Sequence, residues 1–207
     1  MKYIDFYNKF KDYPLIELEN IKNIYPDFDT RRLYEWQKNG YLDKVINKFY
    51  IIKNRKFTDY EINFIANKLC EPSYLSLEFA LNYYSLIPEI VFWRTSITSK
   101  KTKKYNGEIG NFLYRSIKEQ FFFGYKFIKF NNLAFKIAEP EKALLDFLYS
   151  RKDIKNENDL YELRVNEYEY KEIIDQKKLK NYLQQFNSKI LTKKIKILNK
   201  ILNIKND

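Results

Sequence analysis

The sequence predicts an α+β protein, in which a small unit of helices and one β-hairpin, residues 1–58, precedes a larger mixed α/β domain, residues 59–207. Three observations support this class. Apolar residues recur at helical spacing near the start, β-rich runs bounded by turn residues follow, and helical spacing returns after Pro140. With 207 residues, 45% of them hydrophobic, the chain can bury a substantial core. We therefore expect the larger domain to hold a central sheet with helices at its C-terminal end.

Composition excludes several kinds of chemistry. The chain has no histidine and one cysteine, Cys70, so it offers no Ser-His or Cys-His nucleophile, no imidazole ligand and no internal disulfide. Its four scattered glycines are too few for a nucleotide-binding phosphate loop. We expect no catalytic residues, no bound metal and no small-molecule cofactor. Because residues 1–13 alternate charged and aromatic side chains and no later apolar run is of membrane length, we also expect a soluble, cytoplasmic protein without a membrane partner.

The first part of the chain predicts three helices. Residues 3–10 have aromatic side chains at helical spacing, and residues 15–21 predict a second, shorter helix. After a turn, a third helix is expected over residues 30–38. Asp29 is expected to cap its start, because a carboxylate can accept hydrogen bonds from the free amides of the first turn, and Gly40 to end it.

The third helix and the segment after it carry the functional signal of this unit. Leu33 and Trp36 fall on one face of the helix, and charged side chains occupy the other. Two β-rich runs follow, residues 41–46 and 49–52, with Asn47-Lys48 as a two-residue turn. Three helices and a basic hairpin predict a winged helix-turn-helix, whose third helix enters the major groove of DNA while lysines of the hairpin hold phosphates.

The distribution of basic side chains along the chain supports this interpretation. The net charge of +11 follows from a lysine-rich composition, but residues 30–58 alone carry eight basic against two acidic side chains. Arg31 and Arg32 are expected to read bases, since a guanidinium can bind guanine through two hydrogen bonds. A merely solvated helix face is the alternative. The full set of expected DNA contacts is Thr30, Arg31, Arg32, Glu35, Lys38, Lys44, Lys48, Lys53, Arg55 and Lys56.

The second domain is expected to begin with a capping box, TDYE at residues 58–61, in which side chains at both ends of one helical turn satisfy each other's backbone amides. A helix led by Pro140 and two or three more helices are expected to fill the chain to its end. Between them we expect a helix over residues 76–84 and strands over residues 90–97, 111–117, 121–130 and 133–137.

Six segments of the second domain resemble, in order, the signature of AbiEi-type antitoxin domains. They are SLEFALNYYSLIPE (76–89), TSITSKKTKK (95–104), GNFLYR (110–115), FFGY (122–125), AEPEKALLDFLY (138–149) and ELRVN (162–166). The resemblance implies a transcriptional repressor and antitoxin of a type IV toxin-antitoxin system, an abortive-infection device for phage defence. Such a protein binds inverted repeats in its own double-stranded operator DNA, neutralises a nucleotidyltransferase-like toxin directly or indirectly, and is not an enzyme.

The chain departs from the family pattern at two positions. Phe49 stands where we expect a glycine in the turn of the wing, which puts the geometry of the wing in doubt. Ser116 stands where the family often has a histidine, which argues against a catalytic role for that position.

Carboxylates give the alternative hypothesis, a metal-dependent nuclease or nucleotidyltransferase. Asp27 and Asp29 form a D-x-D pair, and Glu139, Glu141 and Asp146 cluster around the AEPEK motif. We favour structural roles, because the aspartates lie between two predicted helices and the glutamates suit the positive end of a helix dipole.

Two lysine-rich segments leave their roles open. Lys100, Lys101, Lys103 and Lys104 are expected between strands, where they would touch DNA or the toxin unless the segment is only a solvated loop. Residues 188–204 predict a last helix with a broad apolar side. We expect it to dock on its own domain and to expose its lysines, with dimerisation, DNA contact or membrane contact as alternatives.

Overall fold

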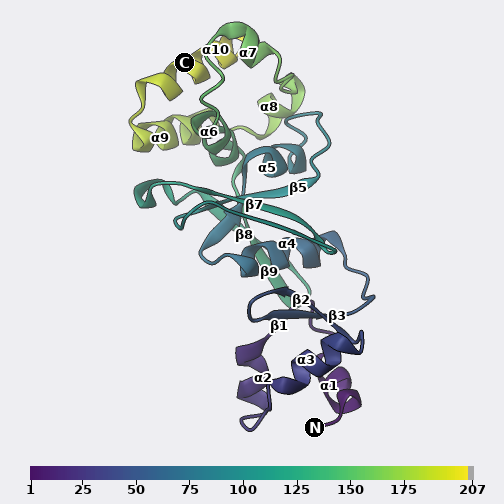
Figure 1. Ribbon diagram of the computed structural model, residues 1–207. Coiled ribbons are helices and arrows are strands. Elements are labelled where there is room, and N and C mark those ends of the chain that lie inside the picture. Colours follow the sequence, from purple (N-terminus) through teal and green to yellow (C-terminus); the bar gives the residue numbers. More distant parts are fainter. Residues whose placement is uncertain (205–207) are drawn as a thin grey trace. The chain divides into compact units, whose positions relative to one another are not determined.

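The computed structural model describes residues 1–204, and the protein is mixed α+β as predicted (Figure 1). The chain divides into two compact units, residues 1–69 and the residues from Cys70 onward. The division lies after Leu69, whereas we expected it after Thr58. The capping box does begin a helix, α4 (Asp59–Leu69), because the Thr58 amide donates to Glu61 at 2.8 Å and the Glu61 amide to the Thr58 hydroxyl at 3.3 Å. This helix groups with the first unit.

The first unit contains three helices, a small sheet and α4. The elements before α4 are α1 (Tyr3–Phe10), β1 (Ile16–Glu17), α2 (Leu18–Ile24), α3 (Arg31–Lys38), β2 (Leu42–Ile46) and β3 (Phe49–Ile52). The strands form an antiparallel sheet in the order β1-β3-β2. Our expectation of a helix from Leu15 was wrong at its start, because Ile16 and Glu17 pair with β3 instead.

Aromatic side chains dominate the core of the first unit. The Trp36 ring lies 4.8 Å from that of Phe6 and 5.9 Å from that of Phe28, measured between centroids. These contacts join α3 to α1 and to the loop before α3. The buried cluster comprises Phe6, Phe10, Ile16, Ile21, Phe28, Leu33, Trp36, Leu42, Tyr50 and Ile52. Burial of this one face of α3 leaves the opposite face to the solvent.

A six-stranded mixed sheet forms the centre of the second unit, in the order β6-β7-β5-β4-β9-β8. The β5–β7 and β4–β9 pairs are parallel, and the others are antiparallel. The elements are β4 (Ser73–Leu75), α5 (Leu77–Tyr83), β5 (Trp93–Thr98), β6 (Lys103–Gly107), β7 (Gly110–Ser116), a 3-10 turn (Glu119–Phe121), β8 (Tyr125–Phe130) and β9 (Leu133–Ala138).

Three expectations for this sheet need correction. Residues 121–130 are not one strand, because Gly124 adopts a left-handed φ of +70° and only residues beyond it pair with β9. Residues 90–92 precede β5 and do not belong to it. The strands β4 and β6 were not predicted, since β4 has only three residues and β6 is rich in lysine and polar side chains.

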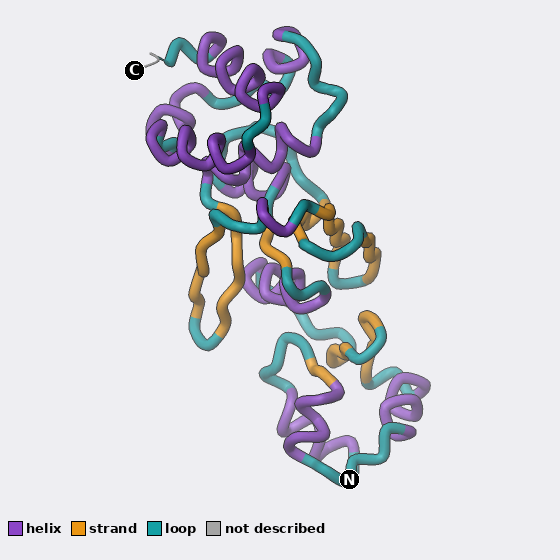
Figure 2. The backbone as a smooth tube through the Cα atoms, turned by 90° about the vertical axis from the view of Figure 1, so that its left-hand side faces the viewer, coloured by secondary structure: helices purple, strands orange, loops and turns teal. Residues whose placement is uncertain are grey.

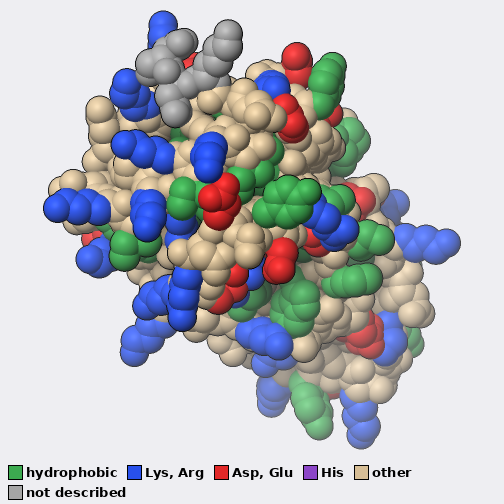
Figure 3. All heavy atoms as spheres, turned by 90° about the horizontal axis from the view of Figure 1, so that it is seen from above, with side chains coloured by type: hydrophobic (Ala, Val, Ile, Leu, Met, Phe, Trp, Pro, Cys, Tyr) green, Lys and Arg blue, Asp and Glu red, His purple; other side chains and the backbone are tan. Residues whose placement is uncertain are grey.

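Helices gather on one side of this sheet (Figures 1 and 2). They are α6 (Pro140–Ser150), α7 (Glu157–Tyr161), α8 (Glu167–Ile173), α9 (Gln176–Phe186) and α10 (Lys189–Ile201), so four helices follow α6 within residues 151–204, where two or three were expected. The last helix docks on its own unit as predicted, packing against α6 and α7 through a buried side that includes Leu191, Ile195 and Leu198. Exposed lysine and arginine side chains are numerous over these helices (Figure 3). Within residues 1–204 no helix is both long enough and apolar enough to span a membrane.

Tyr170 joins α8 to α10 and gives the fold a pH dependence. Its ring is fully buried, and its hydroxyl donates to Asn199 Oδ1 at 2.7 Å. Burial raises the pKa of Tyr170 to about 12, whereas an unfolded tyrosine titrates near ~10. Folding therefore favours the neutral phenol. Its contribution is complete below about pH 10 and is lost as the pH rises towards 12.

We expect the free energy of unfolding to fall more steeply above about pH 10 in the wild type than in a Tyr170→Phe variant. The difference in slope should approach about 1.4 kcal/mol per pH unit. Urea unfolding curves at several pH values between 8 and 11.5 measure it. The variant also lacks the hydrogen bond to Asn199, which lowers its stability equally at every pH in this range. Parallel plots of unfolding free energy against pH for the two proteins would therefore contradict the raised pKa of Tyr170.

Candidate nucleic-acid interface

The helix α3 has one buried and one exposed face, as the sequence predicts. Leu33 and Trp36 are buried, whereas the side chain of Arg31 is 87% exposed. Thr30, Glu35 and Lys38 are exposed with it, and Arg32 is partly buried. Sequence reasoning missed Tyr34, which is 72% exposed. Its position, three residues after Arg31 and on the same side of the helix, could have identified it from the sequence.

Asp29 and Arg31 form an exposed pair at the start of this helix. The Asp29 carboxylate accepts from the Arg31 backbone amide at 3.0 Å and pairs with the guanidinium at 2.9 Å. The hydrogen bond from the Arg31 side chain holds the pKa of Asp29 below its usual value. Asp29 thus accepts from an amide of the first turn as expected, but the N-cap position itself belongs to Thr30 and not to Asp29. Because water surrounds the pair, it is weak, and Arg31 can exchange Asp29 for another acceptor.

The four hairpin lysines differ in what they contact. Lys48 pairs with the exposed Glu19 at 2.8 Å, and Lys53 pairs with the partly buried Asp43 at 3.3 Å. Lys44 and Lys56 are exposed and form no ion pair with any described residue, and the same holds for Lys38 of α3. The first unit therefore presents free ammonium groups together with others held in weak, exchangeable pairs.

The turn of the hairpin explains the unexpected phenylalanine. Asn47 and Lys48 connect β2 to β3, and Asn47 adopts a positive φ of 29°. Asparagine tolerates this region better than most residues, because its short polar side chain can bond locally. Phe49 is the first residue of β3 and pairs with Glu17. The turn does not need a glycine at that position.

Arg55 has a structural position, unlike the other expected DNA contacts. Its guanidinium donates to the Lys11 carbonyl at 3.0 Å and to the Tyr13 carbonyl, and pairs with Glu61 at 2.5 Å. The side chains of Arg55 and Glu61 are only 17% and 16% exposed. Arg55 thereby ties α4 to the loop after α1, which differs from the DNA contact that we expected of it.

An Arg55→Gln variant should lose about 1.5–3 kcal/mol of unfolding free energy, since hydrogen bonds that involve charged groups contribute this much and Glu61 loses its partner. Urea unfolding measures the change. The neighbouring Lys56→Gln variant is the matched control and should keep the stability of the wild type. Equal stability of all three proteins would show that the contacts of Arg55 are not structural.

The lysines of the second unit lie partly on a strand. Lys100 and Lys101 belong to the turn after β5, but Lys103 and Lys104 belong to β6, an edge strand of the sheet, so the loop expected there is shorter. All four are exposed. The Lys104 ammonium stands 4.4 Å from the centroid of the Trp93 ring, a cation–π contact.

A buried ion pair lies at the centre of the second unit. Lys142 and Asp146, one turn apart on α6, pair with each other, and both side chains are 0% exposed. The Tyr74 hydroxyl donates to Asp146 at 3.0 Å and accepts from the Lys142 ammonium at 2.9 Å, while the Ser76 hydroxyl donates to Asp146 at 2.9 Å. Each charge therefore has partners of the opposite sign or polarity.

Burial and pairing act against each other on the pKa values of this pair. Burial raises the pKa of Asp146 and lowers that of Lys142, and their mutual attraction opposes both shifts. Rings of Tyr74, Phe123 and Phe186 surround the ammonium, with centroids 5.0–5.4 Å away. Satisfied bonds and exclusion of solvent give the pair a structural role.

The two glutamates of the AEPEK motif are also engaged. Glu139 directly precedes α6 and accepts from the Tyr182 hydroxyl and, at 3.4 Å, from Lys178. Glu141 lies in the first turn and accepts from the Asp175 amide at 2.9 Å. Both stand at the helix start as expected. Among residues 1–204 no three or more cysteine, aspartate or glutamate side chains are grouped so that they could hold a metal ion.

Comparison of the sequence with protein-family models gives no match. A search against curated proteins likewise finds no matching sequence.

Proposed function

We propose that this protein is an AbiEi-type antitoxin that binds its operator DNA through the first unit and represses its own operon. The observation that carries the proposal is the exposed face of α3, where Arg31, Tyr34 and Lys38 follow helical spacing opposite the buried Leu33 and Trp36. A helix that is anchored by one face and presents guanidinium groups on the other suits the major groove.

The hairpin supports the same proposal. In a winged helix the wing contacts the DNA backbone, and β2 and β3 with the residues after them carry Lys44, Lys48, Lys53 and Lys56. Phosphate contacts give affinity and orientation but not sequence preference. We therefore assign base reading to α3 and phosphate contacts to the hairpin, and we propose cytoplasmic double-stranded DNA with inverted repeats as the partner.

For the second unit we propose neutralisation of a nucleotidyltransferase-like toxin, directly or indirectly, on the basis of the ordered motif resemblance. We propose no enzymatic role. Asp29 is held by Arg31, and Asp146 by Lys142, Tyr74 and Ser76. The Asp146 carboxylate is buried, so it cannot take a metal ion without breaking its ion pair, whereas the exposed Asp29 accepts from the first turn of α3.

Fluorescence anisotropy with labelled DNA from directly upstream of the coding region tests the proposal, with scrambled DNA as the control. Four hairpin lysines on phosphates would contribute a slope of about −3.6 to the plot of log affinity against log salt. Preference for the upstream DNA together with a steep salt dependence supports the regulator. Equal and weak binding to both DNAs would remove the DNA-binding role and leave neutralisation to be tested by co-expression with the neighbouring toxin gene.

A Lys56→Gln variant should flatten that salt dependence by about 0.9, the contribution of a single phosphate contact, on both DNAs alike. The exposed and unpaired position of Lys56 motivates the choice. Anisotropy titrations at four salt concentrations give the slopes. An unchanged slope would place Lys56 outside the interface.

A further inference from the structure

The second unit contains a cavity of about 1090 Å³ with a basic lining. It is bounded by β7, the end of α6, the loop into α7 and the first turns of α10. Five basic side chains line it, and among the described residues no aspartate or glutamate does so. These side chains are Arg115, Lys152, Lys155, Lys193 and Lys194.

A neighbouring cavity differs from the basic one in the sign of its charged lining. That cavity, of about 700 Å³, shares Leu113 and Ile154 with the basic one. Its charged lining is mostly acidic and consists of Glu78, Glu89, Asp153, Asp159 and Glu162 with Lys104 and Arg151. The fold thus separates the two signs of charge on either side of Leu113 and Ile154.

Arg115 is the least satisfied charge in the basic cavity. It projects from β7, is partly buried, and its Nε atom is enclosed without a hydrogen-bond partner. No ion pair joins Arg115 to any residue within 1–204. Enclosing the Nε–H without an acceptor costs free energy, and the attraction between an anion in the cavity and the partly exposed guanidinium would offset that cost.

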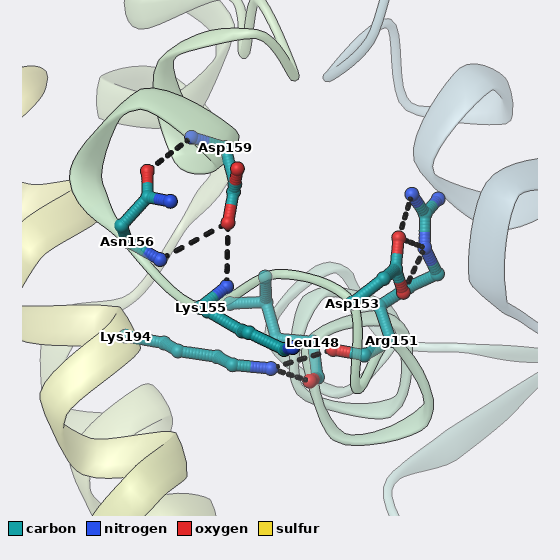
Figure 4. A network of polar contacts seen from close by, with 7 residues as sticks. All are labelled: Leu148, Arg151, Asp153, Lys155, Asn156, Asp159 and Lys194. Carbon is teal, nitrogen blue, oxygen red and sulfur yellow. Dashed lines mark hydrogen bonds and ion pairs between the residues drawn. The ribbon is translucent and has the colours of Figure 1, made fainter.

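Lys194 holds a second positive charge at the wall of the cavity. Its ammonium donates to the carbonyls of Leu148 and Arg151 at 2.8 and 2.7 Å, at the C-terminal end of α6 (Figure 4). An ammonium has three protons, so one remains for a ligand. Burial lowers the pKa of Lys194, and an anion nearby would act in the opposite direction.

Hydroxyl groups and apolar side chains complete the lining. Thr102, Ser116, Ser150 and Ser188 supply hydroxyls, and Ile190 and Ile197 supply apolar surface. Ser188 caps α10, whose thirteen residues direct the positive end of a helix dipole towards this region. Cations, hydroxyls and apolar surface together suit a ligand with a phosphate group and an uncharged body.

We propose that this cavity binds a phosphorylated small molecule of nucleotide size, with Arg115 and Lys194 on its phosphate. This site is separate from the DNA interface proposed for the first unit, and it does not depend on that interface.

Isothermal titration calorimetry of the full chain tests the site with three probes: ATP, pyrophosphate and adenosine. We expect saturable binding of ATP and no detectable binding of adenosine. Pyrophosphate that binds as tightly as ATP would assign recognition to the phosphate alone, and weaker pyrophosphate would show that the uncharged body contributes; both agree with the proposal. Adenosine that binds as well as ATP, or no saturable binding of either phosphate probe, would overturn it.

Variants then locate the site. Arg115→Gln should weaken ATP binding about tenfold or more, the usual effect of losing a hydrogen bond to a charged group. Arg115→Lys, which keeps the charge, should retain most of the affinity. Lys129→Gln removes one exposed charge of β8 outside the cavity and should change nothing. Thermal unfolding confirms that each variant is folded, which is expected because Arg115 has no partner to lose.

Two outcomes of the variant series would overturn the site. Equal weakening by Arg115→Gln and Lys129→Gln would mean that ATP responds to net charge only. If Arg115→Gln weakened binding of double-stranded DNA but not of ATP, the basic lining would belong to a DNA surface.

Discussion

An Asp146→Asn variant is expected to lose about 3–5 kcal/mol of its unfolding free energy, because it leaves the buried ammonium of Lys142 without its counter-charge. The rings around Lys142 offer cation–π attraction, and the Tyr74 hydroxyl still accepts one proton at 2.9 Å, but none of them replaces the lost negative charge. Urea unfolding followed by circular dichroism measures the loss. A loss of this size would be a large part of the stability of an ordinary domain.

Two further variants test whether the loss of stability comes from the burial of the charges or from the loss of any ion pair. Asp153→Asn removes the partner of Arg151 in an ion pair whose side chains are 35% and 61% exposed, and its unfolding midpoint should stay close to that of the wild type. Lys142→Met combined with Asp146→Asn removes both charges and should be more stable than Asp146→Asn alone. If Asp146→Asn unfolded at the same midpoint as Asp153→Asn, the buried pair would not hold the fold together.

Replacing Arg31 and Arg32 together with alanine should weaken binding to the upstream DNA by at least about 2 kcal/mol, or roughly thirtyfold. Each arginine that reads a base contributes discrimination as well as charge, so binding to scrambled DNA should fall less. Neutralisation of the toxin should persist, because we assign it to the second unit. Anisotropy titrations measure the affinities, and co-expression with the toxin measures neutralisation.

The matched control for this prediction removes two other charges of the first unit. Lys9→Ala combined with Lys11→Ala takes exposed lysines from α1 and the residue after it, outside α3 and the hairpin. It should preserve the preference for the upstream DNA. If the wild type and the Arg31→Ala/Arg32→Ala variant bound the upstream DNA with equal affinity, α3 would not be the reading helix.

Local patterns in the sequence were sufficient for much of the first unit. The helices α1 and α3, the Asn47-Lys48 turn and the capping box at Thr58 depend on residues only a few positions apart, so spacing and residue type reveal them. The two faces of α3 follow from the same spacing. The start of α2 did not, because a strand pairing between Ile16 and Tyr50 replaces the expected first turn.

The charges whose partners are distant in sequence could not be interpreted this way. Arg55 resembled its neighbour Lys56 until the fold brought it to the carbonyls of Lys11 and Tyr13, more than forty positions away. Asp146 resembled a candidate metal ligand, but its bonds to Tyr74 and Ser76 span about seventy positions and enclose it completely.

By itself the sequence determined the chemical groups at hand, the helical faces and the positions of the basic segments, because these depend on residue type and short-range spacing. Only the tertiary structure decided which charges are buried and satisfied and which remain open. The basic cavity is the clearest case, since β7, α6 and α10 contribute Arg115, Ser150 and Lys194 to one lining. Desolvation and pairing depend on every neighbour of a charge in space, and a single strand or helix contains too few of them.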